Sequence, residues 1–476
     1  MYLRFTVAFV IFVVAGSAFA QPQQQQQSVE DRLQRLEQEN RRILDAFESS
    51  EVRNASLIKE VQMLRLESED LREGAESWRT SDLEQRVNAL TSALDVTDWT
   101  PATKSGLPIR FYGFIRMDAY WNSARATDPI IPFGVLPEGV NGIGRNDSQF
   151  ALDPRLTRFG FDVDAGEIAG AKVTAKLETD FANFPSGSTE SRATPRIRLA
   201  YINFDFGELD LRIGQDWDVV SPLYPAVHSE LLLWGVGNLG DRRAQVQLIW
   251  NTGDPKGFAF TAELSAGLTG AVDGADNDGI GGRSNIDGFD SGHPHGQLRL
   301  GGSFSSWVTA ERAAIGFWGY VASLETDTRY DGNDRYTPFT VGVDIVLPLF
   351  DRVSLRGEAW FGQALSDLRG NILQDINTAT GKEISGWGGF AEIHWQATDT
   401  LRLAVGGSID DPDNGDLNFG VSGENRALNW TVYLSSKLDL GGGLTTGLDV
   451  IYWETQWLDS GIGNLLRANY WIQLNF

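Results

Sequence analysis

The sequence ANYWIQLNF occupies residues 468–476, and the chain ends on its phenylalanine. Every second position is apolar, namely Tyr470, Ile472, Leu474 and Phe476. Alternation with a period of two predicts a β-strand with one apolar face. Chain ends are usually frayed and polar. An aromatic-tipped strand at this place therefore predicts that the final residue is itself part of a sheet.

The first twenty residues, MYLRFTVAFVIFVVAGSAFA, have the organisation of a secretory signal peptide. Arg4 lies in a short polar region, an apolar core runs from Phe5 to Ala15, and Ala18-Phe19-Ala20 offers a small-x-small cleavage site. We expect residues 1–20 to be removed. An uncleaved membrane anchor is the alternative, and the short apolar core disfavours it.

Composition narrows the function classes. No internal apolar stretch among the 476 residues approaches the roughly 20 that a membrane helix needs, and the mean hydropathy is −0.23. The net charge of −24 argues against nucleic-acid binding, which requires a basic face. With no cysteine and four histidines, the chain offers no disulfide or thiolate site. We predict no catalytic residue, no metal and no cofactor.

A polar spacer, QPQQQQQ at residues 21–27, precedes a helical pattern over residues 28–98. Asn40 takes an a position, where a buried Asn fixes the register of a coiled coil. A lone amphipathic helix packed on a domain is the alternative to the predicted periplasmic coiled coil. The apolar residues of the seam repeat at alternating steps of four and three: Leu33, Leu36, Ile43, Phe47, Leu57, Val61, Leu64, Leu71, Ala75 and Trp78, then Leu83, Val87, Leu90 and Leu94.

From residue 99 to 476 the period changes from heptads to two, which predicts an all-β domain of about sixteen antiparallel strands. The expected strands are approximately 109–121, 155–165, 170–183, 195–207, 209–220, 244–252, 257–268, 295–307, 313–327, 337–349, 352–365, 384–397, 400–411, 425–438, 443–458 and 464–476.

The links between these strands alternate between short and long, for example FDR at 350–352 and the stretch 366–383 that follows the next strand. A sandwich gives no reason for such alternation. A transmembrane barrel does, because its turns are short at one end and its loops long at the other, with an even number of strands. We therefore predict an outer-membrane β-barrel over residues 99–476.

The two faces of the predicted strands also differ. In AKVTAKLETDF at 171–181, Val173 and Leu177 share a face opposite Lys176, Glu178 and Asp180. A soluble sheet also alternates, but no helices are predicted that could cover so much apolar surface. Tryptophans near strand ends are expected to form interfacial girdles: Trp121, Trp217, Trp250, Trp307, Trp395, Trp453 and Trp457.

Signal peptide, coiled coil and a sixteen-strand barrel together resemble the DcaP-like porins, which are named for dicarboxylate uptake. Local similarity lies in TRFGFDV at 157–163, AKLETDF at 175–181, RIRLAYINF at 196–204 and IGQDW at 213–217. The resemblance implies a homotrimer with a periplasmic coil and uptake of small, often anionic solutes. The alternating terminal residues Tyr470, Ile472, Leu474 and Phe476 resemble the signal read by the barrel-assembly machinery.

Arginines on the predicted polar faces are candidates to line the pore and contact solute, because guanidinium groups suit carboxylates and phosphates. By resemblance, the loop 221–243 is expected to fold inward. Carboxylates share the same faces, including Asp118, Glu178 and Asp216, so the alternative is that these arginines form ion pairs within the wall. The candidates are Arg116, Arg158, Arg196, Arg198, Arg212, Arg242, Arg243, Arg299 and Arg356.

The sequence thus predicts an outer-membrane porin for passive diffusion of small hydrophilic solutes, with anions as the candidate class. Its expected partners are outer-membrane lipid, lipopolysaccharide and the barrel-assembly machinery. A structural barrel that anchors a periplasmic tether is the second hypothesis. An outer-membrane enzyme is disfavoured, because no Ser/His motif is recognisable. The loop 269–294 contains DGADNDGIGG, but its spacing departs from that of a calcium loop.

Overall fold

The computed structural model describes residues 107–476 except 138–146, 183–192, 229–231, 255, 270–291, 307, 310 and 420–424. The predicted signal peptide, spacer and coiled coil, including Asn40, lie outside the described residues, as do Trp307 and most of the loop 269–294. Within the described part, no helix is long and apolar enough to span a membrane.

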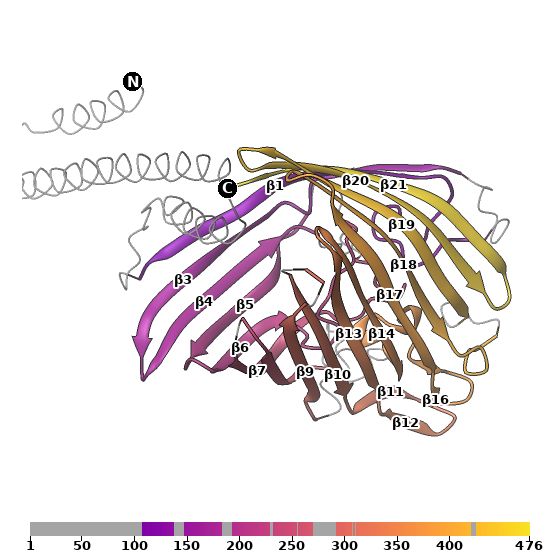
Figure 1. Cartoon of the computed structure of the whole chain (residues 1–476). Helices are drawn as coiled ribbons and strands as arrows, with labels where there is room; N and C mark the ends of the chain where they lie inside the picture. Colours follow the sequence, from indigo (N-terminus) through magenta and orange to yellow (C-terminus); the bar gives the residue numbers. More distant parts are fainter. Residues whose placement is uncertain are drawn as a thin grey trace, which may run out of the picture. The chain divides into compact units, whose positions relative to one another are not determined.

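Sixteen antiparallel strands close into a barrel, and Figure 1 shows them side by side. A seventeenth strand of the same sheet, β2 (Gln149–Asp153), pairs only with the second half of β1. The predicted all-β barrel is thereby confirmed. The wall strands are β1 (Ile109–Asn122), β3 (Arg158–Ile168), β4 (Ala171–Asp180), β5 (Arg196–Asp205), β6 (Leu209–Trp217), β7 (Arg242–Gly253), β8 (Ala259–Gly267), β9 (His295–Ser305), β10 (Arg312–Val321), β13 (Phe339–Phe350), β14 (Val353–Gln363), β17 (Ser385–Gln396), β18 (Leu401–Pro412), β19 (Arg426–Gly441), β20 (Leu444–Trp457) and β21 (Gly461–Asn475).

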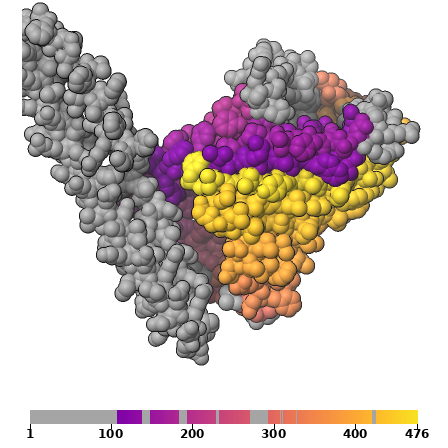
Figure 2. All heavy atoms as spheres, turned by 90° about the horizontal axis from the view of Figure 1, so that it is seen from above, coloured from indigo at the N-terminus to yellow at the C-terminus, as the bar shows by residue number. Residues whose placement is uncertain are grey.

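The barrel closes between its first and last strands, and Figure 2 shows β1 in indigo beside the yellow C-terminal strands. Phe476 is held beyond the end of β21, since its N–H donates to the carbonyl of Gly113 at 3.0 Å and its carbonyl accepts from Gly113 at 3.1 Å. The Phe476 ring stacks on Phe111 with 5.4 Å between centroids. Gly113 is needed here, because a Cβ would lie 2.4 Å from the carbonyl oxygen of Arg158. The expectation that the last residue joins the sheet is confirmed.

The wall is apolar outside and polar inside. On β21 the side chains of Tyr470, Ile472 and Leu474 are exposed, whereas Arg467, Asn469 and Trp471 at alternating positions are buried in the interior. This alternation repeats along the other strands, as expected when successive side chains of a barrel strand point in and out. Closure leaves no unpaired edge, which an apolar environment requires.

Two strand predictions need correction. The expected strand 313–327 is in fact β10, which ends at Val321, followed by the first strand of a separate hairpin, β11 (Leu324–Tyr330) with β12 (Asn333–Tyr336). The missed strand β2 lies in the predicted link 122–154. Both errors have one cause: periodicity reports alternation along a chain, but it does not show where the hydrogen-bonding partner changes.

The tryptophan prediction is partly wrong. Trp121, Trp250 and Trp395 are exposed on the outer face, as a girdle requires. Trp453, by contrast, is fully buried at an inward position of β20, and the indole of Trp457 donates to the carbonyl of Val135 at 2.9 Å. Trp217 likewise packs against Trp234, with 6.3 Å between ring centroids. Proximity to a strand end does not reveal which face a side chain occupies.

Candidate functional site: the lumen

The loop 218–241, between β6 and β7, folds into the barrel. Its backbone N–H groups donate to carboxylates on three strands of the far wall, β14, β17 and β20. The hydroxyl of Ser221 also donates to Glu358. The backbone pairs are Leu223 with Glu358 at 2.6 Å, Ala226 with Glu392 at 2.8 Å, and His228 with Asp449 at 2.8 Å.

These carboxylates therefore serve as anchors for a loop. Hydrogen bonds to charged groups stabilise by about 1.5–3 kcal/mol each, so three of them fix the loop course firmly. The inward fold expected for the loop is present. Its boundary differs, because β7 begins at Arg242 and both Arg242 and Arg243 belong to the wall strand.

A second loop, 123–137, is held inside by a buried arginine. Arg467 of β21 donates to the carbonyls of Pro129 at 2.9 Å and Ile130 at 2.8 Å, and to Asn122 Oδ1 at 3.0 Å. Its guanidinium lies 4.4 Å from the ring centroid of Tyr120. Sequence reasoning did not single out Arg467, and a period of two gives no indication that backbone carbonyls would be its partners.

Asn429 of β19 links this loop to the first one. Its amide donates to the carbonyl of Phe133 at 3.0 Å and to that of Gly235 at 2.7 Å. Around this junction lies an apolar cluster to which Val135, Trp234 and Trp453 contribute. Part of the interior is therefore filled by packed loop side chains.

The loop 364–384, between β14 and β17, also packs inside. Asn371, Ile372 and Leu373 all have positive φ values, of 51°, 51° and 60°. The N–H of Ile372 donates to the fully buried Asp410 at 3.2 Å. Left-handed backbone is costly for a β-branched residue, so this buried carboxylate helps to hold a conformation that the chain would otherwise avoid.

Ion pairs join the loop 364–384 to the base of the loop 218–241. Arg243 bridges Asp218 at 2.7 Å and Asp367 at 2.5 Å, and Arg369 pairs with Asp241 at 2.5 Å. Burial raises the pKa of Asp241, but Arg369 and Arg242 together outweigh burial and hold that pKa below its usual value. The three inward loops thus form one connected body.

The near wall, β3 to β6, carries four of the nine predicted pore-lining arginines, and each of the four is paired. The pairs are Arg158 with Glu178 at 3.4 Å, Arg196 with Asp180 at 2.6 Å, Arg198 with both Glu178 at 2.9 Å and Asp180 at 2.7 Å, and Arg212 with Asp216 at 2.5 Å. The alternative of ion pairs within the wall therefore describes their geometry.

These pairs are nevertheless asymmetric in exposure. The Arg196 side chain is 24% exposed while Asp180 is fully buried, and Arg212 is 27% exposed while Asp216 is 9% exposed. A guanidinium has five N–H donors, so it can hold a carboxylate with some and offer others to the lumen. In these two pairs the guanidinium is consequently more accessible from the lumen than the carboxylate that it holds.

The other candidate arginines lie on other strands of the barrel. Arg116 pairs with Asp118 at 2.7 Å, and Arg299 pairs with both Glu263 at 3.0 Å and Asp344 at 2.8 Å. Arg242 lies 4.7 Å from the ring centroid of Trp217. Arg356 is half-buried on the inner face of β14, where the described residues give it no ion pair. The nine candidates share the interior without forming one ring.

His228 lies beside both a serine and an aspartate, which raises the question of a hydrolytic triad. Its Nδ1 is 3.1 Å from Asp449 Oδ1 and 3.3 Å from Ser435 Oγ. Both partners face the same ring nitrogen, whereas a proton relay needs them on opposite nitrogens. The arrangement suits loop anchoring. Across the described part of the chain, no group of three or more acidic or histidine ligands is placed to hold a metal.

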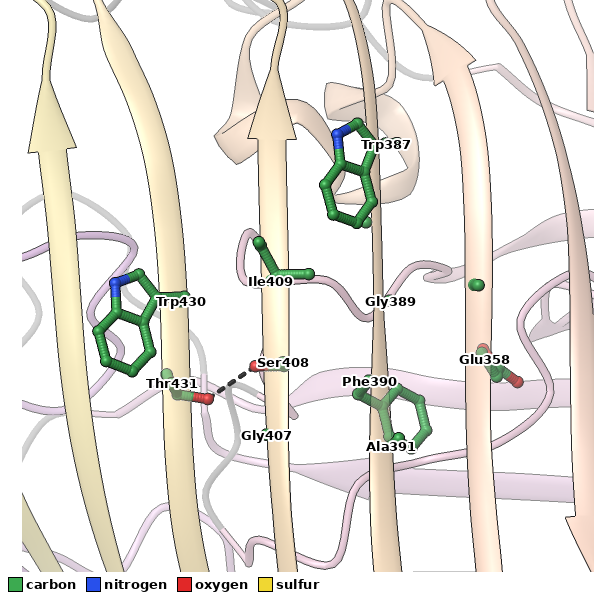
Figure 3. Close-up of a pocket in the computed structure, with 12 residues that line it drawn as sticks. Glu358, Trp387, Gly389, Phe390, Ala391, Gly407, Ser408, Ile409, Trp430 and Thr431 are labelled. Carbon is green, nitrogen blue, oxygen red and sulfur yellow. Dashed lines mark hydrogen bonds between the residues drawn. The ribbon is translucent and has the colours of Figure 1, made fainter.

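A separate hollow lies on the outer surface of β14, β17, β18 and β19. Figure 3 shows Trp387 and Trp430 on either side of Ile409, and small residues such as Gly389, Ala391 and Gly407 complete the lining. Since Trp387 is exposed on the outer face, this hollow belongs to the apolar outside and not to the lumen.

A closed sixteen-strand barrel, apolar outside and polar inside with loops folded into its interior, has the architecture of the outer-membrane porins. The chain is similar to the crystal structure of the outer membrane channel DcaP of Acinetobacter baumannii, with TM-score 0.60, 16% identity, and coverage of 79% of this chain and 99% of that one. It is also similar to the anion-selective porin from Comamonas acidovorans, with TM-score 0.51, 10% identity, and coverage of 78% and 100%.

By sequence, no family model and no curated protein matches the chain. The resemblance to DcaP-like porins is thus supported by fold similarity, and these two similar structures are an outer membrane channel and an anion-selective porin.

Proposed function

We propose that the protein is an outer-membrane porin, a water-filled channel for passive diffusion of small hydrophilic solutes. The observation that carries the proposal is the polar inner wall, together with the loop 218–241, which crosses the lumen and is held there by hydrogen bonds to Glu358, Glu392 and Asp449. Such an inward loop narrows a wide barrel to a size that selects among solutes.

Sidedness follows from the lengths of the connections. Barrels of this kind place short turns in the periplasm and long loops outside, which puts the loops 123–137, 218–241 and 364–384 toward the cell exterior. With this orientation we propose a periplasmic location for residues 28–98 and contact of the exposed apolar band with lipid and lipopolysaccharide.

A second candidate function, a structural barrel that anchors a periplasmic tether, is favoured by one observation. The apolar cluster around Val135, Trp234 and Trp453 fills part of the interior, as expected of a plugged barrel. The porin remains the better proposal, because none of the arginines of β3 to β6 belongs to that cluster.

Recording from the purified protein in planar bilayers tests the proposal. A porin gives stable unitary conductance, and a trimer gives steps in multiples of three. A barrel that remains folded in detergent but conducts no ions contradicts the porin and supports the anchor.

We further propose that the channel prefers anions and assembles as a homotrimer. The exposed guanidinium groups of Arg158, Arg196 and Arg212 support the first statement. The predicted coiled coil and the resemblance to DcaP-like porins support the second. The terminal residues Tyr470 to Phe476 are proposed as the signal for barrel insertion.

A further inference from the structure

Two cations face each other directly on the inner wall near its short-turn end. Arg402 of β18 and Lys437 of β19 are Cα partners in the antiparallel register. Both lie on inward positions: Val405 and Leu434 are exposed on the opposite faces of the same two strands, whereas Ala404 and Ser435 are buried. Neither residue was among the sequence-based candidates.

This pair lacks the neutralising partners found elsewhere in the lumen. Arg402 donates from Nε to Gln396 Oε1 at 2.6 Å, which orients the guanidinium without cancelling its charge. Among the described residues, neither Arg402 nor Lys437 forms an ion pair. Asp439, two positions beyond Lys437 on the same face, forms no ion pair with it and accepts the N–H of Gly441 at 2.8 Å, although its charge offsets part of the charge of Lys437.

The contrast with the remaining wall is informative. The arginines of β3 to β6 each have a buried carboxylate behind them, and Arg116 of β1 is paired with Asp118. Like charges directly opposite in a sheet are destabilising. Most arginines on the inner wall have a carboxylate in an ion pair, whereas Arg402 and Lys437 face each other at a water-accessible mouth without one.

We propose that Arg402 and Lys437 form a binding site for a divalent oxyanion at the short-turn mouth of the lumen. The ligand would be a small dicarboxylate or hydrogenphosphate, whose two charges match one guanidinium and one ammonium. Arg402 supplies the Nη donors left free by Gln396, and Lys437 supplies up to three further donors. The site rests on the proposed function only in requiring that solutes reach this mouth.

The test measures thermal unfolding of the full detergent-solubilised protein during titration with succinate or inorganic phosphate at constant ionic strength. Acetate and chloride serve as monovalent controls. The wild type is expected to show a saturable rise in melting temperature with the divalent anions only, as a ligand of the native state produces. The double variant R402Q/K437Q is expected to bind at least roughly tenfold more weakly, since charge-assisted hydrogen bonds are lost.

Two further measurements, the stability of the ligand-free double variant and the anion response of a control arginine variant, distinguish binding at this site from a general effect of losing positive charge. Without ligand, R402Q/K437Q should be no less stable than the wild type, because a repulsion has been removed. The matched control R352Q changes an exposed turn arginine paired with Asp399 at 2.9 Å and should keep the anion response. An unchanged response in R402Q/K437Q, or none in the wild type, overturns the site. A response to only one of the two divalent anions identifies which source the site accepts.

Bilayer recording keeps the two proposals distinguishable. If the protein conducts but shows no divalent-anion response, the porin stands and the site fails. If the response is present but the protein is silent in bilayers, the site stands and the porin fails.

Discussion

At the level of single residues, the role of each arginine in this lumen depends on the group that its guanidinium binds. Arg196 and Arg212 hold carboxylates that are nearly inaccessible, so each pair presents guanidinium donors to the interior. Arg467 has carbonyl partners instead and anchors a loop. The same residue type therefore has two roles, and burial of its partner separates them.

Replacing Arg196, Arg198 and Arg212 by alanine should shift the reversal potential in a salt gradient toward cation preference. The reason is that the carboxylates behind them become the dominant fixed charges. A narrower control compares two variants. R212Q removes one positive charge, whereas R212Q/D216N removes both charges of the ion pair. The double variant should return toward the wild-type reversal potential, and an unshifted potential in the triple alanine variant contradicts anion preference.

The lowered pKa of Asp241 predicts that the folded protein becomes less stable to heat at acid pH. Because its folded pKa lies below the usual value near 4, its contribution is fully present above that value and is lost as the pH falls through the lowered folded pKa. The heat-unfolding midpoint of the wild type should therefore lose this contribution only below about pH 4. D241N should lack that part of the pH dependence, whereas D334N, in the exposed pair with Arg329, should retain it. Parallel profiles for wild type and D241N contradict the assignment.

At the level of elements, the three inward loops are fastened by side chains that the strands supply. Glu358, Glu392 and Asp449 come from strands far from the loop 218–241 in sequence, yet they receive its N–H groups in order along the chain. A rigid wall thereby determines the course of an irregular segment, which on its own would lack partners for its buried backbone groups.

Releasing this loop should widen the channel. E358A/D449A removes two of the three carboxylates, each worth about 1.5–3 kcal/mol in hydrogen bonds to a charged group. Single-channel recording should show higher conductance and more open-state noise than the wild type. The control D334A alters a carboxylate on the β11–β12 hairpin and should leave both unchanged. Equal conductance in E358A/D449A means that the loop is held without these groups.

The closing strand predicts a second element-level effect. F476A removes the ring that stacks on Phe111 and the proposed recognition feature. Insertion into the outer membrane of cells should slow, while refolding into detergent should continue because the β1–β21 pairing is intact. F350A, which alters an exposed phenylalanine at the end of β13, is the matched control. Equal insertion rates for the wild type and F476A contradict the signal.

At the level of the whole molecule, the barrel is one closed sheet whose register links the chain ends. The pairing of β1 with β21 makes the wall depend on both ends of residues 109–475. Closure gives the backbone groups of every wall strand hydrogen-bonding partners on both sides, which is the condition for stability in an apolar medium.

Deleting residues 28–98 tests the proposed role of the coiled coil. We expect the shortened protein to retain a folded, conducting barrel but to lose trimers at a lower temperature, as judged by unheated gel electrophoresis and cross-linking. Deleting only the spacer 21–27 should leave trimers unchanged. Trimers that persist equally after both deletions show that the coil does not hold the assembly.

The amino-acid sequence by itself determined the barrel, its number of strands and the apolar outer face, because these depend on alternation within each segment. Alternating residues such as Leu177 and Glu178 must point to opposite sides wherever the strand lies. Only the tertiary structure decided that Glu392 anchors a loop, that Trp453 lies inside and that Arg402 faces Lys437. Those facts depend on register and on which distant segments meet, and no local period encodes either.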